Sequence, residues 1–214
     1  MHKRRKAMAV LAAIAISFLA VSIRAQQAQD EPLLRAANRI RKEIVTLPEY
    51  GVFDWITFAI APGQDGYVVT LKGYASRPVL KSGAGQVAKK VEGVSEVRNE
   101  IEVLPLSRVD EDVRLRVYAA IYFHATLSRY NPGRGTPIFG GMGGLRRTAQ
   151  LGISNNPPVG YHPISIIVKN GNVILEGVVD TDMDKQIAEM QANTVAGVFS
   201  VQNHLVSLQK PKKK

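Results

Sequence analysis

The spacing of apolar and polar residues changes several times along the chain, and each change predicts a new element. Apolar side chains first recur every three or four positions, as on one face of a helix: Leu33, Ala37, Ile40, Ile44 and Leu47. They then alternate with polar or small residues over 56–60, as in a strand, and a second strand near 67–73 follows the turn APGQDG. Helical spacing returns at 77–91, and alternation returns at 97–103. The first half is therefore predicted to run helix, strand, strand, helix, strand.

The second half repeats this order. One helix is predicted from a single apolar face: Val113, Val117, Ala120, Ile121, His124 and Leu127. A strand at 164–168 is joined through Asn170-Gly171, a strong hairpin signal, to a strand at 173–178. A last strand at 199–208 follows a second helix, which is predicted from a shorter stripe: Met183, Ile187, Met190 and Thr194.

Matching residues at a constant offset of 104 show that the two halves are an internal repeat. The matched pairs are Leu71 with Leu175, Gly73 with Gly177, Gly93 and Val94 with Gly197 and Val198, Val97 with Val201, Asn99 with Asn203, and Leu104 with Leu208. A one-residue gap also brings Gly66 onto Gly171. Two copies are too few for a solenoid, so we predict two tandem domains, 31–104 and 108–208, joined near Pro105.

The order of elements in each copy favours the α+β class. We expect two tandem small αββαβ sandwiches, each a three-stranded mixed sheet with two helices on one face. Each copy is short for an independent hydrophobic core, so docking of the two copies on each other is also expected.

The spacing from the hairpin glycine to the Gly-Val pair and the Val-x-Asn strand resembles the BON domain, a family named for bacterial osmotically induced and nodulation proteins. The residues that carry the resemblance are Gly66, Gly73, Gly93, Val94, Val97 and Asn99, with their counterparts Gly171, Gly177, Gly197, Val198, Val201 and Asn203. It covers most of residues 31–208 except 131–160. The resemblance implies periplasmic or outer-membrane-associated modules with an αββαβ fold, which contact phospholipid or envelope proteins and have no catalytic residues. Local chemistry gives these glycines a structural role at helix ends and hairpins.

The N-terminus has the layout of a secretory signal peptide. Basic residues at positions 3–6 precede the apolar run MAVLAAIAISFLAV at 8–21, and the small residue Ala25 follows. We expect cleavage near Ala25 and a periplasmic location, with peripheral membrane association left open. The alternative is an N-terminal anchor that is not cleaved.

The formal net charge of +10 lies mostly outside the predicted domains. Residues 1–25 contribute +5 and the lysines of the 209–214 tail contribute +4, whereas each predicted domain is only +1. A nucleic-acid-binding domain would carry a basic face of its own, so no nucleic-acid partner is expected.

One segment interrupts the repeat. Residues 131–160 separate the first helix and first strand of the second copy, are rich in glycine and proline, and carry only arginine as charged residues. Insertions of this length in a small domain are usually functional or disordered. Both interpretations stay open: a solvated loop, or a loop that contacts lipid or a partner.

The sequence contains no recognisable catalytic or metal site. It has no cysteine, which excludes disulfides and thiolate chemistry. Three histidines follow the predicted cleavage point without metal-ligand spacing, and the first is interpreted as a core or boundary residue: His124, His162 and His204. Asp180, Asp182 and Asp184 are interpreted as capping a helix and complementing its dipole. We therefore predict no enzyme activity, no metal and no cofactor.

These features predict a non-catalytic periplasmic module that contacts anionic phospholipid or an envelope protein, in envelope stress or integrity. The alternative is a structural or accessory subunit of an envelope assembly, with the insertion as its docking segment. The candidate contact residues supply positive charge or apolar surface: Arg134, Phe139, Met142, Leu145, Arg146, Arg147, Lys210, Lys212, Lys213 and Lys214. The oligomeric state stays open.

Overall fold

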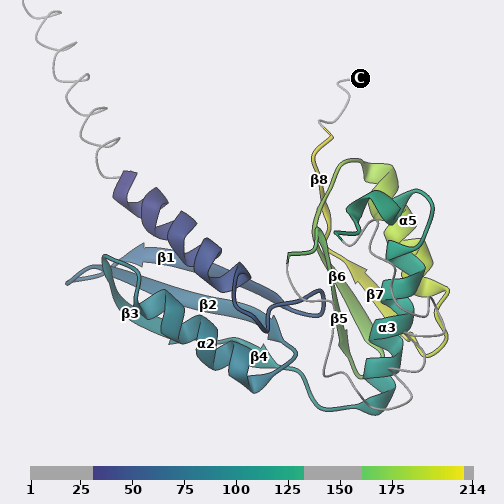
Figure 1. Ribbon diagram of the computed structural model, residues 1–214, viewed down its shortest axis with the longest axis horizontal. Coiled ribbons are helices and arrows are strands. Elements are labelled where there is room, and N and C mark those ends of the chain that lie inside the picture. The colour runs from purple at the N-terminus through teal and green to yellow at the C-terminus, as the bar shows by residue number, and fades with distance from the viewer. Residues whose placement is uncertain (1–30, 133–160, 210–214) are drawn as a thin grey trace, which may run out of the picture.

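The computed structural model describes residues 31–132 and 161–209, which form two α+β units side by side (Figure 1). The first unit runs through a first helix over residues 31–45, β1 (Trp55–Pro62), β2 (Tyr67–Ala75), α2 (Pro78–Lys89), β3 (Val94–Asn99) and β4 (Glu102–Val103). Strand β2 lies in the middle of the sheet, antiparallel to β1 and parallel to both β3 and β4. The first helix and α2 cover one face of this sheet (Figure 1).

The second unit has the same plan. Its elements are α3 (Arg108–Tyr122), the 3-10 helix η1 (Leu127–Tyr130), β5 (Ile164–Lys169), β6 (Asn172–Val179), α5 (Asp182–Asn193), β7 (Ser200–Asn203) and β8 (Val206–Ser207). Strand β6 is central, antiparallel to β5 and parallel to β7 and β8. The predicted α+β class, with two mixed sheets in tandem, is confirmed; the exact domain limits stay a prediction.

Each unit has its own hydrophobic core between helices and sheet. In the first unit the buried side chains follow the predicted periods, with Ile40 and Ile44 of the first helix facing Leu71 of β2 and Leu80 of α2. The second core is built around α3, β5 and β6, and it includes Val52 from the first half of the chain. The two cores are therefore distinct, but a segment of the first unit contributes to the second.

Two details of the second unit differ from the sequence prediction. Helix α3 ends at Tyr122, so His124 and Leu127 do not lie on its face; the chain turns after the helix, with His124 N donating to Ile121 O, and Leu127 still reaches the core from η1. The predicted stripe of α5 is also wrong for three residues, since Met183, Met190 and Thr194 are exposed.

The inward face of α5 consists of smaller side chains than the pattern predicted. Asp184, Ala188 and Ala192 are buried there. Alanines allow the helix to approach the sheet closely, and Asp184 is tolerated because its Oδ2 atom accepts hydrogen bonds from Tyr130 and Thr181 inside the protein. The larger Met183 and Met190 lie outside this inward face and are exposed to solvent.

The third strand of each sheet is broken rather than continuous. In the first unit the break separates β3 from β4 after Asn99, and in the second it separates β7 from β8 after Asn203. Period-two alternation across 97–103 predicted a single strand, because alternation alone does not register a local break in the hydrogen-bond ladder. The side chains at these two breaks are part of the repeated motif.

Candidate functional site

The repeated glycines Gly73 and Gly177 occupy equivalent positions on the central strands. Their φ angles are 109° and 129°, in the region that favours glycine. A Cβ atom on Gly73 would lie 2.0 Å from the carbonyl oxygen of Trp55, and one on Gly177 would lie 2.0 Å from that of Pro163. These positions need glycine because the backbone at the start of the neighbouring antiparallel strand lies too close for a Cβ atom.

The other repeated glycines and valines close the opposite end of each sheet. Tyr67 N donates to the carbonyl of Gly93 at 2.6 Å, and Phe199 N donates to that of Gly171 at 2.9 Å. The remaining members of this set lie in the same turns, with the two valines packed against their cores: Gly66, Val94, Gly197 and Val198. Gly66 and Gly171 end the hairpin turns before the central strands, and Gly93 and Gly197 lie in the turns that lead to the third strands.

The repeated asparagines tie the broken strands to the second helices. Asn99 Nδ2 donates to Lys81 O at 2.8 Å, and Asn203 Nδ2 donates to Lys185 O at 2.9 Å. Each Oδ1 atom accepts from the backbone N–H two residues later, at 3.3 and 3.2 Å. The asparagine thus bonds both the helix and the strand break, so the repeated motif positions have clear structural roles.

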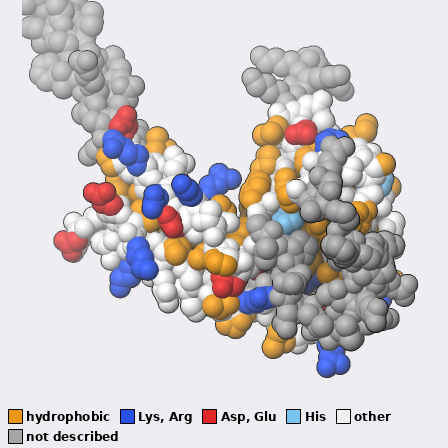
Figure 2. All heavy atoms as spheres, in the orientation of Figure 1, with side chains coloured by type: hydrophobic (Ala, Val, Ile, Leu, Met, Phe, Trp, Pro, Cys, Tyr) orange, Lys and Arg blue, Asp and Glu red, His pale blue; other side chains and the backbone are white. Residues whose placement is uncertain are grey.

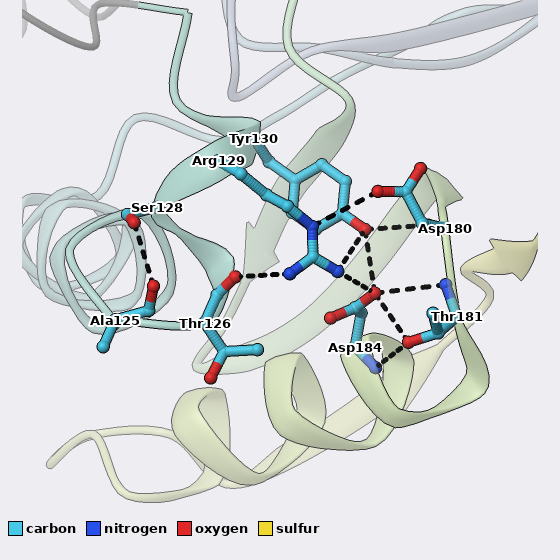
Figure 3. Close-up of polar contacts among 8 residues, drawn as sticks. All are labelled: Ala125, Thr126, Ser128, Arg129, Tyr130, Asp180, Thr181 and Asp184. Atoms are coloured by element: carbon cyan, nitrogen blue, oxygen red, sulfur yellow. Dashed lines mark hydrogen bonds and ion pairs between the residues drawn. The ribbon is translucent and has the colours of Figure 1, made fainter.

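A polar cluster at the start of α5 was not predicted as a site (Figure 3). Asp184 is 1% exposed, and its Oδ2 accepts from Tyr130 Oη at 2.9 Å, from Thr181 Oγ1 at 2.7 Å and from Arg129. Burial by itself raises the pKa of Asp184, but the hydrogen bonds from Thr181 and Tyr130 and the charge of Arg129 outweigh it and hold the pKa below its usual range. The carboxylate is therefore a fixed, charged anchor.

Only part of this cluster could be found from the sequence. The capping interpretation of Asp182 and Asp184 fits the structure, which has a capping box between Thr181 and Asp184. Arg129 and Tyr130 come from η1, more than 50 residues earlier in the chain. Their only sequence signal was their place directly before the insertion.

The cluster fixes the point where the insertion begins. Tyr130 Oη accepts from Asp180 N at 2.7 Å, at the junction of β6 and α5. The chain returns from the insertion at the same end of the sheet, where Val178 N donates to Pro163 O at 3.0 Å. The tail leaves there too, since Leu208 N donates to Val179 O at 2.9 Å. Both ends of the insertion and the start of the tail thus meet where β6 ends.

The ten predicted contact residues belong to that insertion and tail, and they lie outside the described residues. They are Arg134, Phe139, Met142, Leu145, Arg146, Arg147, Lys210, Lys212, Lys213 and Lys214. The predicted signal peptide, residues 1–25, also lies outside them.

The two units meet through the segment that precedes β1. Ile166 N on β5 donates to the carbonyl of Val52 at 2.8 Å. Phe53 meets Tyr118 of α3 edge-on, with ring centroids 6.4 Å apart. Since Val52 and Phe53 are 0% and 6% exposed, this contact is apolar and closed to solvent.

A buried arginine borders the same contact. Arg114 of α3 is 5% exposed and donates from Nη2 to Val168 O at 2.9 Å. Burial lowers the pKa of its guanidinium, while nearby acids, Asp54 of the first unit among them, oppose that shift. Asp54 is itself buried and accepts from Gly51 N and Ser76 N, and burial raises its pKa despite these bonds. These groups order the contact rather than line an open site.

A groove lies in the first unit, between the first helix and the turn after α2, with a volume of about 870 Å³. Its rim carries the basic residues Arg35, Arg39 and Lys90 and the acidic residues Glu43 and Glu92. Arg39 is already paired with Glu43 at 2.8 Å. Figure 2 shows basic and acidic side chains interspersed over this unit, so the groove presents no field of a single sign.

The histidines do not gather into a site. His124 Nδ1 accepts from Thr126 N at 3.3 Å, His162 is buried beside Tyr122, and His204 pairs with Glu176 at 2.8 Å. Within residues 31–132 and 161–209, no group of three or more His, Asp or Glu side chains is arranged to hold a metal ion. Among the helices of the same residues, none combines the length and apolarity of a membrane span.

Comparisons with known proteins agree with the repeat. The family model of the BON domain matches residues 63–105 and 148–209. A comparison with curated proteins finds no significant match. Two solved structures of CdsD, a structural protein of the type III secretion system of Chlamydia trachomatis, are similar at 14% and 13% identity, each over 80% of this chain and over 96% and 91% of their own length. Both have a TM-score of 0.25, at which a likeness supports no conclusion.

The family match covers the repeated glycines, valines and asparagines in both halves, and these residues have the same roles in both sheets. BON domains are in general non-catalytic binding modules, and they are typical of periplasmic proteins. The chain belongs to the BON-domain family, which it matches in two tandem segments.

Proposed function

We propose that this protein is a non-catalytic periplasmic module that binds anionic phospholipid through its insertion and its C-terminal tail. The observation that carries the proposal is the convergence of three chain connections at the end of β6. Tyr130 before the insertion, Pro163 after it and Leu208 before the tail are all hydrogen-bonded to residues 178–184. Basic residues far apart in sequence are thereby attached to one end of one domain.

The charge distribution supports the same arrangement. Acidic and basic side chains are mixed on the first domain, and most of its arginines are paired, as Arg35 with Glu31 and Arg39 with Glu43. A positive field for an anionic surface must therefore come from the arginines of the insertion and the lysines of the tail. Each such residue near an anionic bilayer contributes roughly 1 kcal/mol.

Apolar side chains at the same end would add contact with the bilayer. Tyr161, Met183 and Leu208 are 51%, 67% and 68% exposed, although their neighbours in the chain are fixed by hydrogen bonds. Together with Phe139, Met142 and Leu145 of the insertion, they suit shallow insertion between lipid headgroups.

Vesicle flotation tests this proposal. The protein beginning at residue 26 is mixed with vesicles of phosphatidylcholine alone or with phosphatidylglycerol added. The test variant replaces Arg134, Arg146 and Arg147 by alanine and lacks residues 210–214. We expect it to lose most of its binding to the anionic vesicles, with little change in melting temperature, and we expect salt to weaken the original protein similarly.

The control removes three arginines from the domain surfaces, as many as the test variant replaces in the insertion. Alanine replaces Arg35, Arg39 and Arg116, which are exposed and paired with acids on their own helices. This control should float as the original protein does. Unchanged flotation of the test variant would contradict the lipid proposal and favour the alternative, an accessory subunit that docks on an envelope protein.

A further inference from the structure

The first strands of the two sheets, β1 and β5, are both edge strands. In an antiparallel pair, alternate residues turn their backbone N–H and C=O groups away from the neighbouring strand. On β2, the carbonyls of Leu71 and Ala75 accept from residues 100 and 104 on the side of β3 and β4, so the even-numbered residues of β2 face β1. Their partners are the odd-numbered residues of β1. Ile56, Phe58 and Ile60 therefore point their backbone groups out of the sheet.

The same reasoning places Ile164, Ile166 and Val168 on the outer edge of β5. That edge is capped. Tyr122 Oη accepts from Ile164 N at 3.1 Å and donates to Ile164 O at 2.5 Å. Ile166 N donates to Val52 O, and Val168 O accepts from Arg114. The domain contact and α3 thus close the edge of the second sheet.

The edge of β1 is covered only at its start. There the buried Tyr50 hydroxyl lies beside the backbone of Ile56. Within residues 31–132 and 161–209, the outward N–H and C=O groups of Phe58 and Ile60 have no protein partner. Four residues of this strand, Thr57, Ala59, Ala61 and Pro62, are exposed. The open length of the edge is therefore centred on Ala59.

Natural edge strands usually carry charges, breaks or short lengths that prevent pairing with another chain. The opposite edge of this sheet has such protection, with Glu96 and Arg98 on β3 and the break after Asn99. In the second sheet, β7 is only four residues long. Strand β1, with the sequence WITFAIAP, is eight residues long and has no charged side chain.

We propose that β1 pairs antiparallel with β1 of a second copy of this chain, about a two-fold axis through Ala59. Phe58 of each copy then lies opposite Ile60 of the other, and both pairs exchange N–H···O bonds, which satisfies the open backbone groups. In the same register Pro62, which has no N–H, falls opposite Ile56, whose backbone lies beside the Tyr50 hydroxyl. The ladder of intermolecular hydrogen bonds therefore ends at Pro62, which has no donor, and the open backbone groups of Phe58 and Ile60 match those of the second copy.

The side chains suit this register as well. Ala59 faces its own copy in a pair without hydrogen bonds, where side chains approach most closely, and alanine is small enough to fit. Phe58 and Ile60 lie on the helix-covered face but are only half-buried at the rim of the core. Pairing would cover them and join the two sheets into one.

The oligomeric state of the purified protein, beginning at residue 26, tests the pairing. We expect a concentration-dependent dimer in sedimentation velocity and light scattering. Ala59→Lys places two positive charges opposite each other on the axis and should reduce the molar mass to that of one chain. Thr70→Lys is the matched control, because Thr70 is the β2 partner of Ala59 and lies away from the edge. It should leave the dimer intact.

Cysteine cross-linking tests the register directly, because the chain has no cysteine of its own. In the proposed dimer the Cα atoms of residue 59 lie about 4.5–5.5 Å apart, within the range of a disulfide. Ala59→Cys should therefore form a covalent dimer under mild oxidation. Residue 57 lies opposite residue 61 of the other copy, so the two Thr57 positions are roughly 13 Å apart at the rise of a strand, and Thr57→Cys should not cross-link.

Efficient cross-linking of Ala59→Cys alone supports the proposal, even if Ala59→Lys folds poorly. Equal cross-linking of both cysteine variants would overturn it, because chance collision or another register would then explain the bond. A protein that stays monomeric at every concentration, with neither variant cross-linked, would also overturn it and leave β1 as an edge for a different partner. Neither result depends on lipid binding.

Discussion

The two domains share the glycine and asparagine positions that shape their backbones, but they differ in the polar groups that they bury. In both, a glycine on the central strand allows close approach of the first strand, and an asparagine bonds the break of the third strand to the second helix. Of the described residues, the first domain buries one charged group, Asp54, whereas the second buries Asp110, Arg114 and Asp184. The family resemblance therefore lies in the backbone, and the differences lie in charged side chains.

Each buried charge of the second domain holds a segment that the first domain lacks or uses differently. Asp110 accepts from Asn170 N and Gly171 N, both at 2.8 Å, and so fixes the hairpin turn. Arg114 caps the edge of β5 at the domain contact, and Asp184 fixes the start of the insertion. The buried charges of the second domain thus fix its hairpin turn, its contact with the first domain and the start of the insertion, whereas the first domain keeps an open sheet edge.

The largest expected effect concerns the glycine that both domains have on the central strand. Gly177→Ala should destabilise the second domain by about 2–4 kcal/mol. The alanine would be held at a positive φ angle, and its Cβ atom would lie 2.0 Å from Pro163 O. Gly73→Ala should cost a similar amount in the first domain. Urea unfolding distinguishes them, since Trp55, the sole tryptophan, reports on the first domain by fluorescence and circular dichroism reports on both.

Gly83→Ala is the control for the glycine pair. Gly83 is a helical residue of α2, and a Cβ there would have ordinary contacts of 3.6 Å with Leu47. This substitution should stabilise by roughly 0.5–1 kcal/mol. If Gly73→Ala and Gly177→Ala cost no more than Gly83→Ala, the shared role of the two glycines would be wrong.

A smaller expected effect is that the buried acids of the two domains change the free energy of unfolding in opposite directions as pH falls. The pKa of Asp184 is lowered in the folded state, so its contribution to stability is present above the unfolded pKa, near 3.8, and is lost as pH falls through the lower folded value. Asp184→Asn should cost about 1–3 kcal/mol at pH 7. The variant should then lose less of its free energy of unfolding than the original protein between pH 5 and pH 2.5, measured by urea titration.

Asp54 should show the opposite slope. Burial raises its pKa, so its contribution is present below the unfolded value, near 3.8, and is lost as pH rises through the folded value. Asp54→Asn should therefore gain less stability, or lose more, than the original protein on acidification from pH 7 to pH 3. Parallel pH profiles for the two variants would contradict the comparison.

The backbone plan was predictable from the sequence, whereas the polar contacts were not. Matching glycines and period-two or helical spacing predicted the repeat and the order of elements, because those signals are local. The pairing of Arg129 and Tyr130 with Asp184 depends on a contact between segments more than 50 residues apart. The inward face of α5 was missed for the same reason. An aspartate in a helical pattern predicts an exposed position unless its distant hydrogen-bond partners are known.

The smallest expected effect tests the charge pair between the domains. Lys169 Nζ lies 2.5 Å from Glu102 Oε1, but both side chains are 43% exposed. Exposed pairs are screened by salt and lose side-chain entropy when they form, so Lys169→Ala should leave the melting temperature unchanged. The contact should persist because Val52, Phe53 and Tyr118 are buried in it. Phe53→Ala is the comparison, since it removes apolar packing instead of charge. A larger fall in melting temperature for Lys169→Ala than for Phe53→Ala would mean that charge, and not apolar burial, holds the two domains together.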